Sequence, residues 1–213
     1  MQNPTMAFLM KTGSIEPFYK CLSLKKNTMN FKKWNNYTGW LIWLIATIVY
    51  YKTMEPTVSL WDCGEYIATS STLQVGHPPG APTFNLIGRV FSAWSAPENR
   101  AFMVNFTSAL SSSFTILFLF WVITHLARKL ASANGEEFTD GKKLAVLFSG
   151  AIGALAYTFS DSFWFSAVEA EVYAMSSLCT AIVVWAIFRW EEIADDPGAD
   201  RWIIFIMFIV GLS

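Results

Sequence analysis

Charged residues are scarce in this sequence. Only 15% of its 213 residues are Asp, Glu, Lys or Arg, whereas 54% are hydrophobic. A soluble domain usually carries about 25% charged residues, so this composition argues against an ordinary soluble fold. The net charge is −1. That balance indicates neither a nucleic-acid footprint nor a polybasic membrane-binding patch.

Cysteine is also rare. The three cysteines, Cys21, Cys63 and Cys179, are widely separated, and no CxxC pair occurs. The spacing typical of zinc or redox-active cysteines is therefore missing. The acids and histidines do not form a set of well-spaced metal ligands either. We therefore expect the protein to require no metal and no other cofactor.

Long apolar runs are abundant instead. Five stretches are candidates to cross the roughly 30 Å hydrocarbon core of a membrane. They cover about residues 39–54, 101–126, 144–160, 172–190 and 202–213, and the sequence stops within the last run. These runs predict an all-α polytopic membrane protein, with residues 29–213 as the amino-terminal part of a larger transmembrane domain. The alternative, buried helices of a large soluble core, fits poorly with five runs separated by charged loops.

The first 28 residues show neither a clear period nor a signal-peptide cleavage pattern. A second methionine, Met29, begins a short basic segment just before the first apolar run. We expect residues 1–28 to be a leader that is either untranslated or disordered. Both Met1 and Met29 remain candidates for the true start.

Basic residues indicate the orientation of the spans. If each run crosses the membrane once, the clusters of basic residues share one side, which the positive-inside rule identifies as cytoplasmic. They are Lys25, Lys26, Lys32, Lys33, Arg128, Lys129, Lys142, Lys143, Arg189 and Arg201. Residues 55–100 and 161–171 then lie on the opposite side. The three cysteines fall on one side, on the other side and within a span, so we expect no disulfide among them.

The first extracytoplasmic segment contains the stretch WDCGEYIATSSTLQVGHPPGAP, residues 61–82. A helix over residues 58–73, lying along the membrane surface, would align Asp62, Glu65, Thr69 and Thr72 on one polar face. Two carboxylates one turn apart repel each other unless they share a cation, a substrate or a proton. The pair therefore indicates a functional site. The alternative is that both acids are simply solvated at the interface.

The motif HPPG, residues 77–80, ends this helix because proline disfavours helical backbone and lacks an N–H donor. The rigid turn of Pro78, Pro79 and Gly80 would fix His77 close to the polar face. His77 could then bind a phosphate or a carboxylate, although an ordinary turn histidine is an equal alternative. Arg89 suits phosphate binding, and its alternative role is to reach lipid headgroups.

The second extracytoplasmic segment carries Asp161, Glu169 and Glu171. Acids at the mouth of a membrane helix are costly and indicate function. On a helix, Glu169 and Glu171 would diverge by about 200°, so we expect one of them to face the first segment. Helix capping or solvation is a sufficient explanation for Asp161.

Three segments in this order resemble a membrane protein family. They are WDCGEYIATSSTLQVGHPPGAP, MVNFTSALSSSFTILFLFW and SAVEAEVYAMSSL, and the resemblance covers about residues 40–213. The family was long described as a domain of unknown function, is abundant in Bacteroidetes, and is related to a vertebrate endoplasmic-reticulum protein O-mannosyltransferase of IPT domains. More distantly, an acid followed by HPP is similar to the first extracytoplasmic loop of GT-C glycosyltransferases.

This resemblance implies a GT-C-like amino-terminal half, with about five transmembrane helices and an interfacial helix in the first extracytoplasmic loop. The implied activity is sugar transfer, with inversion, from a polyprenyl-phosphate donor to a hydroxyl of an exported protein. The resemblance places the protein in a bacterial inner membrane with its active face in the periplasm.

The resemblance also implies residue roles. Asp62 matches the loop acid and would be the catalytic base, with Glu65 as partner or alternate base. Many relatives place two acids side by side, whereas Cys63 and Gly64 separate them here, and HPPG replaces the commoner HPPL. The identity of the base therefore stays open between these acids.

The remaining candidates are substrate-binding. His77 and Arg89 would contact the donor phosphate, and Glu169 or Glu171 would hold hydroxyls of the acceptor or sugar.

Two other functions compete with this interpretation. A transporter or flippase of a polar lipid would place acids or helix breaks near the middle of spans, whereas these acids cluster at the outer ends. A scaffold of a surface-assembly complex would leave the pair Asp62 and Glu65 without a task.

Overall fold

The computed structural model describes residues 29–213 except residues 79, 134 and 136. The chain divides into two compact units, Met1–Asn30 and Phe31–Ser213. All the helices described below belong to the second unit. The predicted leader, residues 1–28, lies outside the described residues, and so does Pro79.

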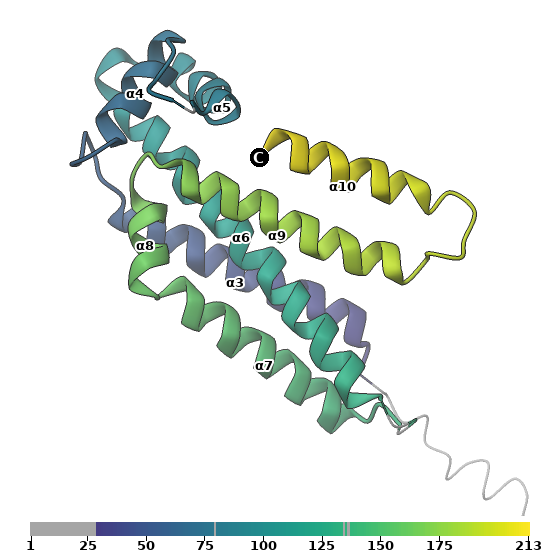
Figure 1. The fold of residues 1–213 in the computed structure, drawn as a ribbon. Coiled ribbons are helices and arrows are strands. Elements are labelled where there is room, and N and C mark those ends of the chain that lie inside the picture. Colours follow the sequence, from purple (N-terminus) through teal and green to yellow (C-terminus); the bar gives the residue numbers. More distant parts are fainter. Residues whose placement is uncertain (1–28, 79, 134, 136) are drawn as a thin grey trace, which may run out of the picture. The chain divides into compact units, whose positions relative to one another are not determined.

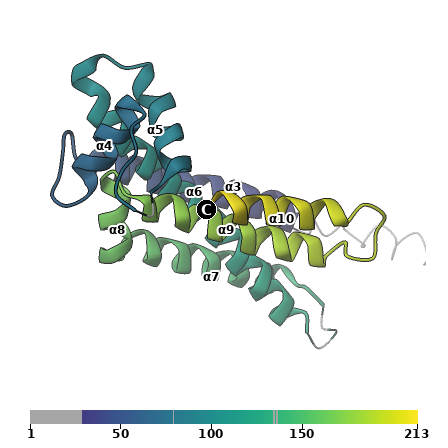
Figure 2. The ribbon, with the colours of Figure 1, turned by 45° about the horizontal axis from the view of Figure 1, so that its top comes forward.

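The second unit is all-helical in its described part, which confirms the predicted class. Its elements are α3 (Phe31–Thr53), α4 (Cys63–Thr72), α5 (Pro82–Ala93), a 3-10 turn (Pro97–Asn99), α6 (Arg100–Ala131), α7 (Asp140–Thr158), α8 (Asp161–Val168), α9 (Val172–Glu191) and α10 (Asp200–Leu212). Helices α3, α6, α7 and α9 run alongside one another, and α4 and α5 lie beyond one end of that group (Figures 1 and 2).

Helix α6 is the centre of this unit and contacts α3, α4, α5, α7, α8 and α9. Its buried face carries small hydroxyl residues, including Ser108, Ser111 and Ser113. Small side chains let neighbouring helices approach closely. The hydroxyls of Ser111 and Ser113 donate to the carbonyls of Thr107 and Ala109, at 2.8 and 2.7 Å. Because these bonds satisfy the two hydroxyls within the helix itself, Ser111 and Ser113 can be buried without polar partners on other helices.

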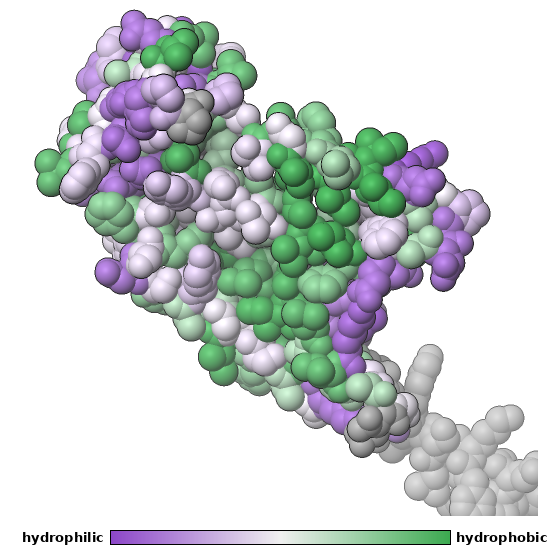
Figure 3. Space-filling view, viewed as in Figure 1, coloured by the Kyte–Doolittle hydropathy of each residue, from purple (hydrophilic) through white to green (hydrophobic). Residues whose placement is uncertain are grey.

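Two segments have the properties of membrane-spanning helices. Residues Pro97–Ala131 and Val172–Glu191 are long and apolar enough to cross a membrane. A third span results if α7 and α8, bent by 65° at their junction, count together. The predicted number of five is not confirmed within the described residues, because α3 and α10 do not meet the same criterion and α10 has only 13 residues. Apolar side chains cover the middle of the face formed by α9 and α10 (Figure 3).

The first loop differs from its predicted form. The helix begins at Cys63 rather than residue 58, and a second helix, α5, packs on it. The hydroxyls of Thr69 and Ser70 both donate to the Asn85 side-chain oxygen at 3.2 Å. Gly88 of α5 lies so close to α4 that an added Cβ would stand 2.9 Å from Ser70 Cβ. The two helices therefore form one tightly joined pair.

Helix α5 turns its apolar side outward. Leu86 and Val90 are 59% and 58% exposed, whereas Phe84, Asn85 and Ser92 are buried. An exposed apolar face on a short surface helix is typical of a helix that lies in the membrane interface. Within this loop it is α5, downstream of the stretch predicted from the sequence, that has such a face.

Replacing Gly88 by Val is expected to separate α4 from α5. The new side chain meets the backbone-proximal atoms of Ser70, so we expect a loss of about 1–3 kcal/mol of stability through overpacking. Thermal unfolding of the purified protein in detergent measures this loss. Gly211→Ala is the matched control, because no atom lies within 4 Å of its added Cβ. Equal unfolding midpoints for the two variants would contradict the close contact.

Candidate functional site

Three predicted site residues come together at the start of α4. Asp62 occupies the N-cap position, Glu65 lies in the first turn, and His77 returns to them after the helix has ended. One potential ligand atom from each side chain lies within 4.8 Å of the others. The chain turns back because Leu73 has a left-handed backbone, with φ 54°, and the N–H of Gln74 donates to Thr69 O at 3.0 Å.

Glu65 and His77 form a two-point contact. The backbone N–H of His77 donates to Glu65 Oε1 at 2.6 Å, and His77 Nδ1 lies 2.9 Å from Glu65 Oε2. Gly76 makes room for this contact, since a Cβ there would stand 2.9 Å from Glu65 Oε1. The hydrogen bonds from His77 lower the pKa of Glu65, and the bond to Glu65 raises the pKa of His77. Glu65 is therefore occupied as an ionised partner of His77.

Replacing Glu65 by Gln is expected to lower the pKa of His77. The pair is complete only while Glu65 is ionised and His77 is protonated. It is therefore lost as pH rises through the raised pKa of His77, and as pH falls through the lowered pKa of Glu65. NMR titration of labelled histidine measures the shift, and the sequence contains only two histidines. Asp161→Asn is the control and should leave the His77 titration unchanged. An unchanged titration in Glu65→Gln would refute the pairing.

Asp62 is the acid left available. It is exposed, and its carboxylate accepts no hydrogen bond from the described residues. The residue before it, Trp61, has φ 65° and is 86% exposed. A left-handed backbone at a bulky residue costs about 1–3 kcal/mol, and such strain clusters at functional sites. The strained residue thus directly precedes the unpartnered carboxylate.

Glu169 and Glu171 lie in the break between α8 and α9, and both are buried. The expectation of a helix there is wrong. Both residues are extended, with φ −136° and −135°. Extended backbone points residues i and i+2 to the same side, so the two acids do not diverge. Burial, together with the charges of Glu169 and Asp62, raises the pKa of Glu171 to about 7.

Each buried acid has its own surroundings. The hydroxyl of Ser59 donates to Glu169 Oε2, whereas Glu169 Oε1 is buried without a hydrogen-bond partner among the described residues. The backbone of Glu171 is held by Ser108, which accepts from its N–H at 3.1 Å and donates to its carbonyl at 3.3 Å. With a pKa near 7, Glu171 is partly protonated at neutral pH and can donate as well as accept a hydrogen bond.

Arg89 lies on α5, and its role as a phosphate contact stays a prediction. Its Nη1 donates to the carbonyl of Ser71 in the last turn of α4. Within the described residues it forms no ion pair with Glu65 or another acid of the site.

The HPPG turn is closed by the Gly80 N–H, which donates to His77 O at 2.9 Å, and Gly80 has φ 82°. Pro78 lies inside this turn, whereas the predicted role of Pro79 falls on a residue that the structure does not describe.

Sequence reasoning missed Asn105. This residue of α6 is fully buried, and its Nδ2 donates to the carbonyls of Glu55 and Thr57, each at 2.8 Å. Its Oδ1 faces Cys63 Sγ at 3.7 Å. Asn105 therefore ties the loop before Asp62 to the central helix. A polar amide inside an apolar run was the signal that could have identified it.

The cluster of Asp62, Glu65 and His77 has the ligand types of a divalent-cation site. Glu65, however, is already engaged twice by His77. The expectation that no metal is required stays a prediction.

Comparison with known proteins shows which protein family this chain resembles. Residues 62–213 match the family model of the "Protein O-mannosyl-transferase TMEM260 N-terminal domain". The chain is 28% identical over 153 residues to Protein O-mannosyl-transferase tmem260 of Dictyostelium discoideum, covering 68% of this chain and 16% of that protein. It is 24% identical over 165 residues to Protein O-mannosyl-transferase TMEM260 of Mus musculus, covering 78% of this chain and 21% of that protein.

No solved structure matches the chain. The match to the family model begins at Asp62 and extends over α4 to α10, which includes all the candidate site residues. The chain therefore spans only part of these relatives, 16% of the length of the Dictyostelium protein and 21% of the length of the mouse protein. Because this model matches most of the chain, the protein belongs to the family of the TMEM260 amino-terminal domain.

Proposed function

We propose that this chain is part of a membrane glycosyltransferase resembling the protein O-mannosyltransferases. The enzyme would move a sugar from a polyprenyl phosphate to a hydroxyl of an exported protein. The observation that carries the proposal is the unpartnered Asp62 carboxylate, which lies beside the Glu65–His77 pair and within the electrostatic range of buried Glu171. The family match supports the reaction class.

In the proposed reaction Asp62 is the general base. It takes the proton of the acceptor hydroxyl while that oxygen forms a bond to the anomeric carbon of the sugar. The bond from this carbon to the phosphate oxygen breaks at the same time, and the lipid phosphate leaves with the electron pair. One displacement inverts the anomeric configuration, so no covalent sugar–enzyme intermediate is required.

The neighbouring residues support this assignment of the base. The lowered pKa of Glu65 makes it a weaker base, and its two bonds to His77 give it a positioning role. Protonated His77 would stabilise the leaving phosphate through a charge-assisted hydrogen bond. Nitrogens of Arg89 that do not bind Ser71 are the second candidate contact for this phosphate.

Glu171 and Glu169 would bind hydroxyls. The protonated form of Glu171 can donate to a hydroxyl of the sugar, and its ionised form can accept from one. The free oxygen of Glu169 can accept from a second hydroxyl. A sugar held at two hydroxyls is oriented for in-line attack, which is a large part of what a transferase must achieve.

The outward apolar face of α5 fits a lipid-linked donor. Leu86 and Val90 would rest in the membrane interface, so the headgroup of a polyprenyl phosphate could meet Asp62 while its tail stays in the bilayer. We place the site on the periplasmic face of a bacterial inner membrane, where exported proteins supply the acceptor hydroxyls.

A reconstituted assay tests the proposal. The complete protein is incubated in liposomes with mannosyl polyprenyl phosphate and a peptide pool from exported proteins, and mass spectrometry follows the gain of one hexose. We expect hexose transfer with an inverted anomeric configuration, determined by NMR on the product. Transfer from a nucleotide sugar instead would refute the lipid donor. Identical glycans in cells with and without the gene would refute glycosyl transfer altogether.

A further inference from the structure

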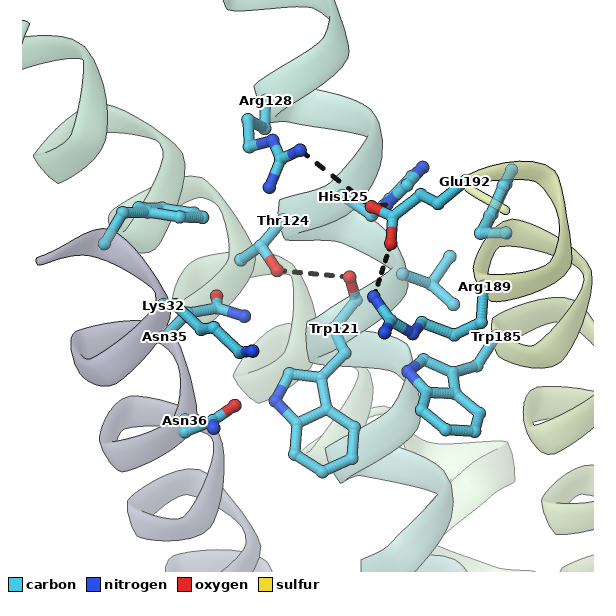
Figure 4. Close-up of a pocket in the computed structure, with 13 residues that line it drawn as sticks. Lys32, Asn35, Asn36, Trp121, Thr124, His125, Arg128, Trp185, Arg189 and Glu192 are labelled. Atoms are coloured by element: carbon cyan, nitrogen blue, oxygen red, sulfur yellow. Dashed lines mark hydrogen bonds and ion pairs between the residues drawn. The ribbon is translucent and has the colours of Figure 1, made fainter. Parts of the chain in front are cut away.

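A second polar site lies at the opposite end of α6 from Asp62. A cavity of about 640 Å³ is bounded by the first turns of α3, the last turns of α6 and the end of α9. Its lining includes Lys32, Trp121, His125, Arg128 and Arg189. Figure 4 shows Lys32 reaching in from α3 and Arg189 from α9, with the Trp121 indole between them. None of these residues takes part in the proposed reaction.

The cavity carries a surplus of positive charge. Glu192 is its only carboxylate among the residues that line it. Glu192 pairs with Arg189 and lies 3.9 Å from Arg128 and 3.4 Å from His125 Nδ1. One carboxylate therefore faces two permanent cations, and Lys32 adds a third that has no ion pair with a described residue. An anion is the ligand that such a cavity favours.

Several polar atoms of the lining are unsatisfied. Asn35 Oδ1, Trp121 Nε1 and His125 Nε2 are buried and have no hydrogen-bond partner among the described residues. Buried polar groups without a partner are rare and costly. The positive-inside tendency explains basic residues at this end of the spans, but it does not explain buried donors and acceptors among the residues that line the cavity.

The surroundings of Trp185 suit a lipid. Trp185 lines this cavity and also an adjoining hollow, which Arg201, Trp202 and Phe205 complete. The Trp185 and Trp202 rings pack edge to face at 5.7 Å. A polar cavity next to an aromatic hollow matches a charged headgroup with an apolar tail, and tryptophan favours the membrane interface.

We propose that this cavity binds the phosphate of an anionic ligand, with Lys32 and Arg189 as its main contacts. A phospholipid headgroup is the source that the aromatic hollow favours, and free phosphate is the other source. Guanidinium and ammonium groups both form charge-assisted hydrogen bonds with phosphate oxygens. This proposal does not rest on the proposed sugar transfer, which concerns the other end of α6.

Bound lipid is the first measurement. The complete protein is purified in mild detergent, and co-purified phosphatidylglycerol is quantified per protein by mass spectrometry. We expect Lys32→Gln with Arg189→Gln to retain about tenfold less of this lipid than the wild type, the effect of losing roughly 1.4 kcal/mol of binding. Lys33→Gln with Lys129→Gln is the matched control, because it removes two charges at the same end outside the cavity. Equal retention in both double variants would overturn the proposal.

A second measurement separates the two sources and guards against misfolding. Lys32→Gln alone breaks no ion pair among the described residues, so it should fold and still weaken binding. Thermal unfolding of delipidated protein is compared with added phosphatidylglycerol, phosphatidylcholine or sodium phosphate. Stabilisation by phosphatidylglycerol alone assigns the site to an anionic lipid, and equal stabilisation by sodium phosphate assigns it to free phosphate. No stabilisation by either anion, or equal stabilisation of wild type and Lys32→Gln, would refute the phosphate site.

Discussion

Replacing Asp62 by Asn is expected to reduce sugar transfer by about 10²–10⁴-fold, the usual contribution of a general base. Asparagine keeps the shape of the side chain but cannot accept the proton of the acceptor hydroxyl. The protein should still accumulate, because Asp62 is exposed and its carboxylate accepts no hydrogen bond from the described residues. Transfer of hexose to the acceptor peptides, normalised to protein level in the membrane, measures the effect.

The control for this variant is Glu98→Gln. Glu98 is an exposed acid in the 3-10 turn before α6 and makes the same change of charge outside the candidate site. It should transfer sugar at the wild-type rate. If Asp62→Asn also keeps that rate, Asp62 is not the base. Glu171, with its pKa raised to about 7, then becomes the next acid to replace.

Replacing Asn105 by Ala is expected to release the loop before Asp62. The variant loses two hydrogen bonds of 2.8 Å, to the carbonyls of Glu55 and Thr57, and leaves a small cavity inside the helix bundle. We expect a loss of about 2 kcal/mol in stability, since each lost bond leaves a carbonyl unpaired. Activity should fall as well, because Asp62 follows this loop directly. Thermal unfolding and the hexose-transfer assay measure the two effects.

The matched control is Asn99→Ala, at an exposed position where the side chain makes no capping bond to α6. It should unfold within the error of the wild type. The anchoring role would be wrong if Asn105→Ala had the same unfolding midpoint as this control. A variant that unfolds early but transfers sugar normally would limit Asn105 to a structural role.

Local spacing in the sequence predicted the meeting of Asp62, Glu65 and His77. Acids one helical turn apart face the same way, and a proline-rich turn must follow the helix end. The shared burial of Glu169 and Glu171 was not predictable in this way, because it depends on the chain leaving helical geometry after Val168. On a continuous helix, the side chains of Glu169 and Glu171 would point in directions about 200° apart.

Other features depend on tertiary contacts. Asn105 is recognisable as an anchor only when the loop at Glu55 lies against α6. Lys32, Arg128 and Arg189 indicated membrane orientation, and nothing in their spacing predicted that they surround one cavity. They lie on three helices, so only the packing of α3 and α9 on α6 brings them together.

Helix α6 has 32 residues and is therefore about 48 Å long. Asn105 and Ser108 near its start hold the segments that carry Asp62 and Glu171, and Trp121 and His125 near its end line the cavity proposed to bind phosphate. A stiff rod that contributes to both places cannot rotate or slide at one end alone. A ligand that binds one position of α6 more tightly would therefore change the binding affinity at the other end. Thermodynamic reciprocity makes this effect equal in both directions. Under the two proposals, an anionic lipid bound at one end of α6 would thereby influence sugar transfer at the other end.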